Sequence, residues 1–65
     1  MTGQELLSIR AALGLSGDKF GAMLGYQGPN VRKIIWALEN GTRSITPQIE
    51  KLAIAYRDGY MPMQE

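Results

Sequence analysis

Four glycines, each placed directly after a run of apolar residues at helical spacing, limit what this 65-residue chain can fold into. Glycine readily adopts the left-handed backbone conformation that is common just past the last turn of a helix. Such positions are held by Gly14, Gly25, Gly41 and Gly59. No stretch of strand length alternates between apolar and polar residues. The sequence therefore predicts an all-α fold, a compact bundle of four to five helices joined by short loops.

Polar residues at capping positions predict where three of these helices begin. Thr2 and Glu5 have capping-box spacing at the start of the first helix. Ser16 is a favourable N-cap for a short second helix, and Thr46 caps a fourth helix whose first position is Pro47. The apolar faces of these three helices are Leu6, Ile9 and Leu13, then Phe20, Met23 and Leu24, then Ile49, Leu52, Ala53 and Tyr56.

The third helix has the most regular apolar pattern in the chain. Its apolar residues recur at i, i+3, i+4 and i+7, and they are Val31, Ile34, Ile35 and Leu38. Proline suits the first turn of a helix, and asparagine is a favourable N-cap. We therefore expect this helix to begin at about Pro29 or Asn30 and to end at Asn40.

The composition excludes most kinds of catalytic site. The chain has no Cys and no His, which excludes disulfides, thiolate nucleophiles, the usual zinc ligand sets and a Ser-His-Asp relay. A domain of this size buries only about 60% of its unfolded surface, which leaves no room for a deep cleft. We expect no enzymatic activity, no cofactor, no metal and no small-molecule ligand.

Neither the apolar stretches nor the charge indicates a membrane protein. The longest apolar stretches are far shorter than the roughly 20 residues needed to cross a bilayer, and Met1 to Glu5 has neither a basic flank nor an apolar signal region. We therefore expect a cytoplasmic protein without a membrane partner. The formal net charge is only +1, so any binding to nucleic acid must depend on where the charged side chains lie.

Two stretches together resemble the helix-turn-helix of the phage repressor and Cro type, also called the xenobiotic-response-element-like regulators. They are Leu15 to Gly25 and Leu38 to Gly41. Gly21 matches the family's small residue where its two helices cross. Arg10 with Glu39 resembles the family's ion pair, which joins the first helix to the end of the recognition helix.

The spacing of the family's motif can be aligned with this chain in two ways, which predict different starts for the third helix. Alignment at Gly21 and Gly25 requires no insertion, whereas alignment at Leu38 to Gly41 places four extra residues near Gly28 to Val31. Either the turn is longer than usual, or the third helix has an additional turn.

The apolar stripe of the third helix predicts which of its residues point outward. At about 100° per residue, the opposite face carries Lys33, Trp36 and Asn40, flanked by Arg32 and Ala37. Arg and Lys can donate to guanine in the major groove, and an apolar or aromatic group can contact the thymine methyl. The candidates for base contacts are Arg32, Lys33, Trp36 and Ala37, with Gln27 and Asn30 if the helix opens earlier. For Trp36 two interpretations stay open: contact with DNA, or partial burial against the second helix, a loop or a dimer partner.

Contacts to the DNA backbone are expected at two places. The start of the second helix presents N–H groups to anions, so Ser16, Gly17 and Lys19 form one candidate clamp. Asp18 lies in the same turn, where the helix dipole favours an anion. The loop after the third helix supplies a second set of candidates: Asn40, Thr42, Arg43 and Ser44. The alternative for Thr42 and Ser44 is that they satisfy the turn or cap the fourth helix.

The resemblance covers roughly residues 4 to 56 and implies a lambda repressor-like DNA-binding domain over residues 1 to 59, with the second and third helices as the helix-turn-helix. It implies a small stand-alone transcriptional repressor of a phage or mobile-element operon, in a bacterial or phage-infected cell. The recognition helix, at about residues 29 to 40, would lie in the major groove of double-stranded DNA. Because one such helix contacts few base pairs, we expect a homodimer on an inverted-repeat operator. Residues 60 to 65 are either part of the dimer surface or a frayed terminus.

The alternative function belongs to another class. The same helical bundle would then be a protein-interaction module, such as an antitoxin or adaptor, with Trp36 and the Met-rich tail as its contact surface.

Overall fold

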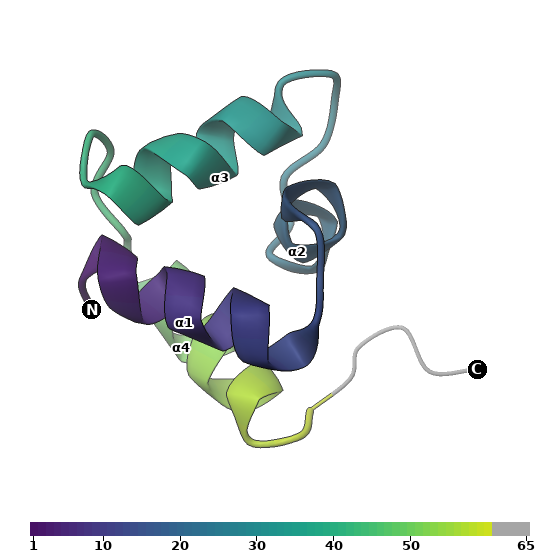
Figure 1. Cartoon of the computed structure of the whole chain (residues 1–65), viewed down its shortest axis with the longest axis vertical. Coiled ribbons are helices and arrows are strands. Elements are labelled where there is room, and N and C mark those ends of the chain that lie inside the picture. The colour runs from purple at the N-terminus through teal and green to yellow at the C-terminus, as the bar shows by residue number, and fades with distance from the viewer. Residues whose placement is uncertain (61–65) are drawn as a thin grey trace.

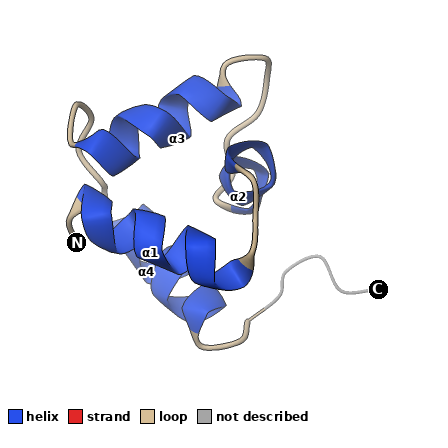
Figure 2. Ribbon diagram, viewed as in Figure 1, coloured by secondary structure: helices blue, strands red, loops and turns tan. Residues whose placement is uncertain are grey.

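The computed structural model describes residues 1 to 60, which contain helices and loops and no strand (Figure 2). The four helices are α1 (Gly3–Leu13), α2 (Gly17–Met23), α3 (Val31–Asn40) and α4 (Pro47–Arg57). The predictions of an all-α fold and of four helices are confirmed, and residues 1 to 60 hold no fifth helix. The prediction that the tail, residues 60 to 65, is a dimer surface or a frayed terminus falls almost wholly on residues 61 to 65, which lie outside the described residues. Over the described part of the chain, no helix has the length and apolar character to span a membrane.

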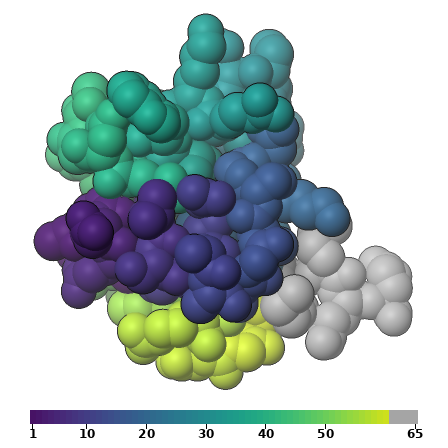
Figure 3. All heavy atoms as spheres, viewed as in Figure 1, coloured from purple at the N-terminus to yellow at the C-terminus, as the bar shows by residue number. Residues whose placement is uncertain are grey.

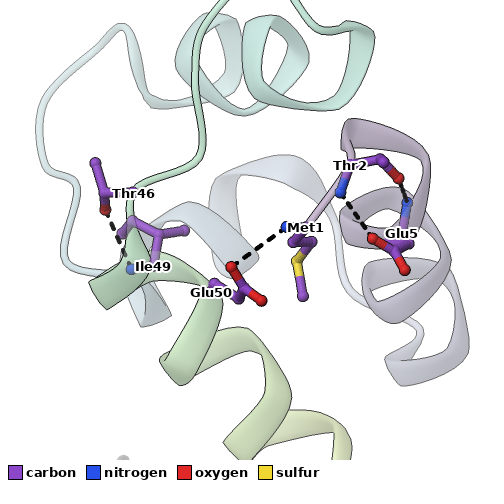
Figure 4. A network of polar contacts seen from close by, with 6 residues as sticks. All are labelled: Met1, Thr2, Glu5, Thr46, Ile49 and Glu50. Carbon is purple, nitrogen blue, oxygen red and sulfur yellow. Dashed lines mark hydrogen bonds and ion pairs between the residues drawn. The ribbon is translucent and has the colours of Figure 1, made fainter.

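Three helices begin at the caps that the sequence predicts. At α1, the Glu5 amide donates to Thr2 Oγ1 at 3.1 Å, and the Thr2 amide donates to Glu5 Oε1 at 2.7 Å (Figure 4). The hydroxyls of Ser16 and Thr46 each accept a backbone amide from the first turn of α2 and α4. The four glycines predicted to be left-handed all have φ between 70° and 108°. Local sequence therefore determines most of the helix boundaries.

The start of α3 agrees with one of the two predicted positions, and the helix ends at Asn40 as predicted. Asn30 is the N-cap: its carbonyl accepts from the Ile34 amide at 3.0 Å, but its side chain makes no capping hydrogen bond. Pro29 lies outside the helix, in the turn that follows Gly28, whose φ is 103°. The connection from α2 to α3 is Leu24 to Asn30, and α3 has 10 residues. Of the two alternatives for this segment, the structure therefore has the long connection, and no helical turn precedes Val31.

The central element of the bundle is α1, which packs against both α3 and α4, while α2 packs against α3 (Figure 1, Figure 3). In Figure 1, α3 runs along one edge of the molecule, and α2 is seen nearly end-on beside it. All four helices contribute to one apolar core. Its buried residues are Leu6, Ile9, Phe20, Leu24, Val31, Ile35, Leu38, Ile49, Ala53 and Tyr56.

Glycine allows two helix pairs to approach closely. A Cβ on Gly21 would lie 2.2 Å from Val31 Cγ1 and 3.1 Å from Ile35 Cγ1, so the backbone of α2 rests directly on side chains of α3. Gly21 is thus the small residue expected where these helices meet. A Cβ on Gly3 would lie 2.3 Å from the carbonyl oxygen of Glu39. This second contact, between the start of α1 and the end of α3, has no counterpart among the expectations from sequence.

The last helix is attached to the bundle by a buried tyrosine and by an ion pair. The hydroxyl of Tyr56 donates to the carbonyl of Met23, and its ring stacks on that of Tyr60 with centroids 5.7 Å apart. Burial raises the pKa of the Tyr56 hydroxyl. The amino group of Met1 lies 3.3 Å from Glu50 Oε1 (Figure 4). These contacts hold α4 in place on α1 and α2, away from the outer face of α3.

Candidate nucleic-acid interface

The outer face of α3 is polar and basic. Its opposite face is buried through Val31, Ile35 and Leu38. The outward residues are exposed, and they are Arg32, Lys33, Trp36 and Asn40. Trp36 keeps 64% of its surface exposed, so neither α2 nor a loop of the same chain covers most of the ring; burial against a dimer partner stays a prediction. Ala37 is half-buried, so it is the least accessible of the base-contact candidates on the helix.

Arg32 is paired with an acidic residue of the neighbouring helix. Its Nη2 donates to Asp18 Oδ2 at 3.0 Å, from the first turn of α3 to the first turn of α2. Both side chains are exposed, Arg32 at 79% and Asp18 at 56%. The guanidinium is therefore accessible to solvent while one of its nitrogens is held by a carboxylate.

The start of α2 lies beside this pair. Gly17 lines a shallow groove together with Arg32, Trp36 and Glu39. The Ser16 hydroxyl already accepts the Lys19 amide at 3.2 Å, so it serves as a cap. The ammonium-bearing side chain of Lys19 is exposed. At this clamp, Lys19 is the residue that supplies positive charge.

The loop after α3 is partly held by its own hydrogen bonds. The Thr42 amide and hydroxyl both donate to Asn40 Oδ1, at 3.0 Å and 2.6 Å. Thr42 and Asn40 therefore satisfy the turn, in agreement with the alternative interpretation of this loop, and the cap of α4 is Thr46. Ser44 is exposed.

Arg43, in the same loop, is positioned by an aromatic ring. Its guanidinium carbon lies 5.7 Å from the centroid of the Tyr26 ring, within the range of a cation–π contact. Its amide donates to the carbonyl of Ala37 at 3.1 Å. This hydrogen bond ties the Arg43 backbone to the last turn of α3, and the Tyr26 ring comes from the connection between α2 and α3. Candidate phosphate contacts thus stand at the start of α2 and just past the C-terminal end of α3.

Arg10 and Glu39 form the expected ion pair. Arg10 Nε donates to Glu39 Oε2 at 2.6 Å and Nη2 donates to Oε1 at 3.2 Å, while Nη1 donates to the carbonyl of Leu15 at 3.1 Å. The hydrogen bonds that Arg10 donates to the Glu39 carboxylate raise the pKa of Arg10. The carboxylate is almost fully buried, at 8% exposure. Its negative charge is therefore neutralised inside the bundle. All three nitrogens of the Arg10 guanidinium take part in these contacts, so the role of Arg10 is structural.

The structure brings together most of the candidate residues. Arg32, Lys33 and Trp36 are exposed on α3, and Arg32 and Trp36 share a groove with Gly17 at the start of α2; Arg43 follows the end of α3. Gln27 and Asn30 are exposed, but they lie in the turn and at the N-cap rather than inside α3. The sequence analysis missed two contacts that support these side chains: Asp18 pairs with Arg32, and Tyr26 lies against Arg43. The partners are far apart in sequence, so no local pattern predicts either contact.

Comparison with protein-family models, with curated proteins and with solved structures finds no match to this chain.

Proposed function

We propose that this chain is a sequence-specific double-stranded DNA-binding protein, with α2 and α3 as a helix-turn-helix of the phage repressor and Cro type. The observation that carries the proposal is the outer face of α3, where Arg32, Lys33 and Trp36 are exposed on a helix whose other face is buried. A major groove about 12 Å wide admits one α-helix. α3 is the recognition helix.

Three exposed residues of this face, Arg32, Lys33 and Trp36, would contact bases. Arg32 and Lys33 donate to guanine O6 and N7, and Trp36 contacts a thymine methyl. Lys19, at the start of α2, and Arg43, past the end of α3, contact phosphates, which sets the register on the duplex without selecting a sequence. Gln27 lies at the edge of this surface.

The proposed biological role follows from the resemblance to phage repressors and from the small size of the outer face of α3. One recognition helix contacts few base pairs, so the protein binds as a homodimer to an inverted repeat with half-sites about one helical turn apart. It represses a phage or mobile-element operon by covering the promoter.

A selection from duplexes with a randomised central segment, followed by a salt titration, tests this function. Two phosphate contacts, Lys19 and Arg43, give a log-log slope near −1.8 per protomer, because each neutralised phosphate contributes about −0.9. Arg32→Ala or Lys33→Ala should relax the preference at one base pair by about 1 to 3 kcal/mol. Arg43→Ala should weaken all sequences alike.

Lys51→Ala is the matched control, because it removes an exposed positive charge from α4. It should leave the sequence preference unchanged and should change the salt slope less than Arg43→Ala does. Failure of the selection to yield any preferred sequence would refute the proposal. A change in base preference caused by Arg43→Ala would instead show that the division between base contacts and phosphate contacts is wrong.

One observation favours a second candidate function. Trp36 is the most exposed of the large apolar side chains in residues 1 to 60, and tryptophan is enriched among residues that dominate protein interfaces. A protein-interaction module, such as an antitoxin or adaptor, would use Trp36 as its anchor. A flat salt response, or no binding to duplex DNA, would favour this candidate.

A further inference from the structure

We propose that Asp18 is a positioning residue that sets the sequence discrimination of Arg32. The inference rests on the proposed function, because it concerns how the recognition helix selects bases. Asp18 belongs to α2 and would touch neither a base nor a phosphate. It acts through the hydrogen bond from Arg32 Nη2 to its Oδ2, 3.0 Å long.

The pair is not explained by stability. Arg32 is 79% exposed and Asp18 is 56% exposed. Ion pairs between such exposed side chains contribute little to the free energy of unfolding. The contact does, however, restrict a long side chain that otherwise samples many rotamers.

The carboxylate is fixed relative to α3. Asp18 lies one turn before Gly21 on α2, and Gly21 is the residue whose missing Cβ lets α2 rest on Val31. Arg32 directly follows Val31. The same close packing that joins the two helices therefore holds Asp18 opposite the first turn of α3.

The geometry leaves a usable donor edge on the guanidinium. An arginine presents five N–H donors in a planar fork. Asp18 accepts from Nη2 alone, and within residues 1 to 60 neither Nε nor Nη1 of Arg32 has another hydrogen-bond partner. Whichever Nη2 hydrogen Asp18 accepts, one edge with two donors remains, formed by Nη2 with either Nη1 or Nε. Such an edge is what a bidentate contact to guanine requires.

Asp18 also acts as a negative charge beside the DNA. It opposes the attraction of phosphates for this surface at every sequence, whereas its effect on the orientation of Arg32 matters only where a guanine is in place. Only the effect on the orientation of Arg32 increases the ratio of specific to non-specific affinity. Removing the carboxylate therefore lowers discrimination while it strengthens non-specific binding.

The test compares Asp18→Asn with Asp58→Asn. Asp58 is a matched control, because it is an exposed carboxylate paired with Arg57 at 3.3 Å, at the end of α4. Wild-type protein first selects its preferred sequence from duplexes with a randomised central segment. Affinities for that duplex, for its single-base variants and for a shuffled duplex are then measured at one salt concentration, and circular dichroism verifies folding.

We expect Asp18→Asn to reduce discrimination about three- to tenfold, the amount expected when one ordered side chain must be immobilised on binding. The loss should fall at the base pair that Arg32→Ala identifies. Binding to the shuffled duplex should tighten. In the Arg32→Ala background, Asp18→Asn should cause no further loss of discrimination, because the two residues act through one contact. Asp58→Asn should leave discrimination unchanged.

The possible results distinguish a failure of the positioning role of Asp18 from a failure of the proposed DNA binding. If wild-type protein selects no sequence, the proposed function fails. If it does select a sequence but Asp18→Asn matches Asp58→Asn, the positioning role is wrong and the function stands. The positioning role is equally wrong if Asp18→Asn tightens binding to all duplexes by the same factor, since Asp18 would then act as a repulsive charge only.

Discussion

Replacing Arg10 with alanine should be one of the most damaging single changes outside the apolar core. The guanidinium makes two hydrogen bonds to Glu39, at 2.6 Å and 3.2 Å, and one to the carbonyl of Leu15. Without it, the Glu39 carboxylate, whose side chain is 8% exposed in the intact protein, loses the partner of its charge. That charge also lies near the C-terminal end of α3, where the helix dipole disfavours an anion.

The expected loss is about 3 kcal/mol. Breaking a buried ion pair by removing one partner typically costs about 3 to 5 kcal/mol. Arg10 retains 25% exposure, so water can reach part of the vacated space, which favours the lower end of this range. A 65-residue domain has a total stability of about 3 to 10 kcal/mol. The loss corresponds to a fall in Tm of about 12 to 24 °C.

Thermal and urea unfolding followed by far-UV circular dichroism measure this loss. Arg57→Ala is the control, because Arg57 pairs with Asp58 at the surface, and its removal should change stability by less than about 0.5 kcal/mol. If Arg10→Ala does not fold, the double variant Arg10→Met with Glu39→Leu should recover folding, since apolar replacement of a buried pair is often neutral or stabilising. Equal stability of Arg10→Ala and Arg57→Ala would refute the reasoning.

Three further perturbations test other parts of the fold. Gly21→Ala should lose about 1 to 2 kcal/mol in urea unfolding, since overpacking against Val31 exceeds the gain in helix propensity; Gly17→Ala, whose Cβ would lie 3.7 Å from its nearest neighbour, should not. Tyr56→Phe should cost about 1 to 2 kcal/mol by removing the donor to the α2 carbonyl. Because the pKa of Tyr56 is raised, its contribution is complete below the ordinary pKa and is lost as pH rises through the folded pKa; the variant should lack this alkaline loss in a Tm–pH profile. A backbone amide lowers the pKa of Glu5, so its stabilising effect is lost as pH falls through that lowered pKa, and Glu5→Gln should flatten the acid limb of the profile.

Sequence and structure agree where the determining contacts are local. The capping box of Thr2 and Glu5 and the hydroxyl caps of Ser16 and Thr46 involve residues within one turn of each other, so their spacing is sufficient to predict them. The start of α3 is different. Pro29 is compatible with a turn and with a first helical position, and the packing of Val31 on a distant glycine is absent from the local pattern.

The sequence predicts which residues of the candidate site face outward, but it does not predict the contacts that hold them in position. Helical geometry places Arg32, Lys33 and Trp36 on the outer face, and the structure has them there. The sequence leaves the exposure of Trp36 open because its large apolar surface favours burial, and only the positions of the other helices determine whether a partner is present. Asp18 lies 14 residues before Arg32, and its side chain reaches Arg32 only after α2 and α3 have packed.

The connection between α2 and α3, from Leu24 to Asn30, does not have to fix the orientation of α3. In a tight turn the loop itself fixes the angle between two helices, whereas here the contact at Gly21 and the shared core fix it. Doubling the length of a flexible loop costs only about 0.6 kcal/mol. Gln27 and Pro29 are exposed and can therefore be exchanged while α3 keeps its place, whereas Gly28 has φ 103°, which strains any other residue. Substitutions at Gln27 and Pro29 should therefore alter this edge of the surface at little risk to folding.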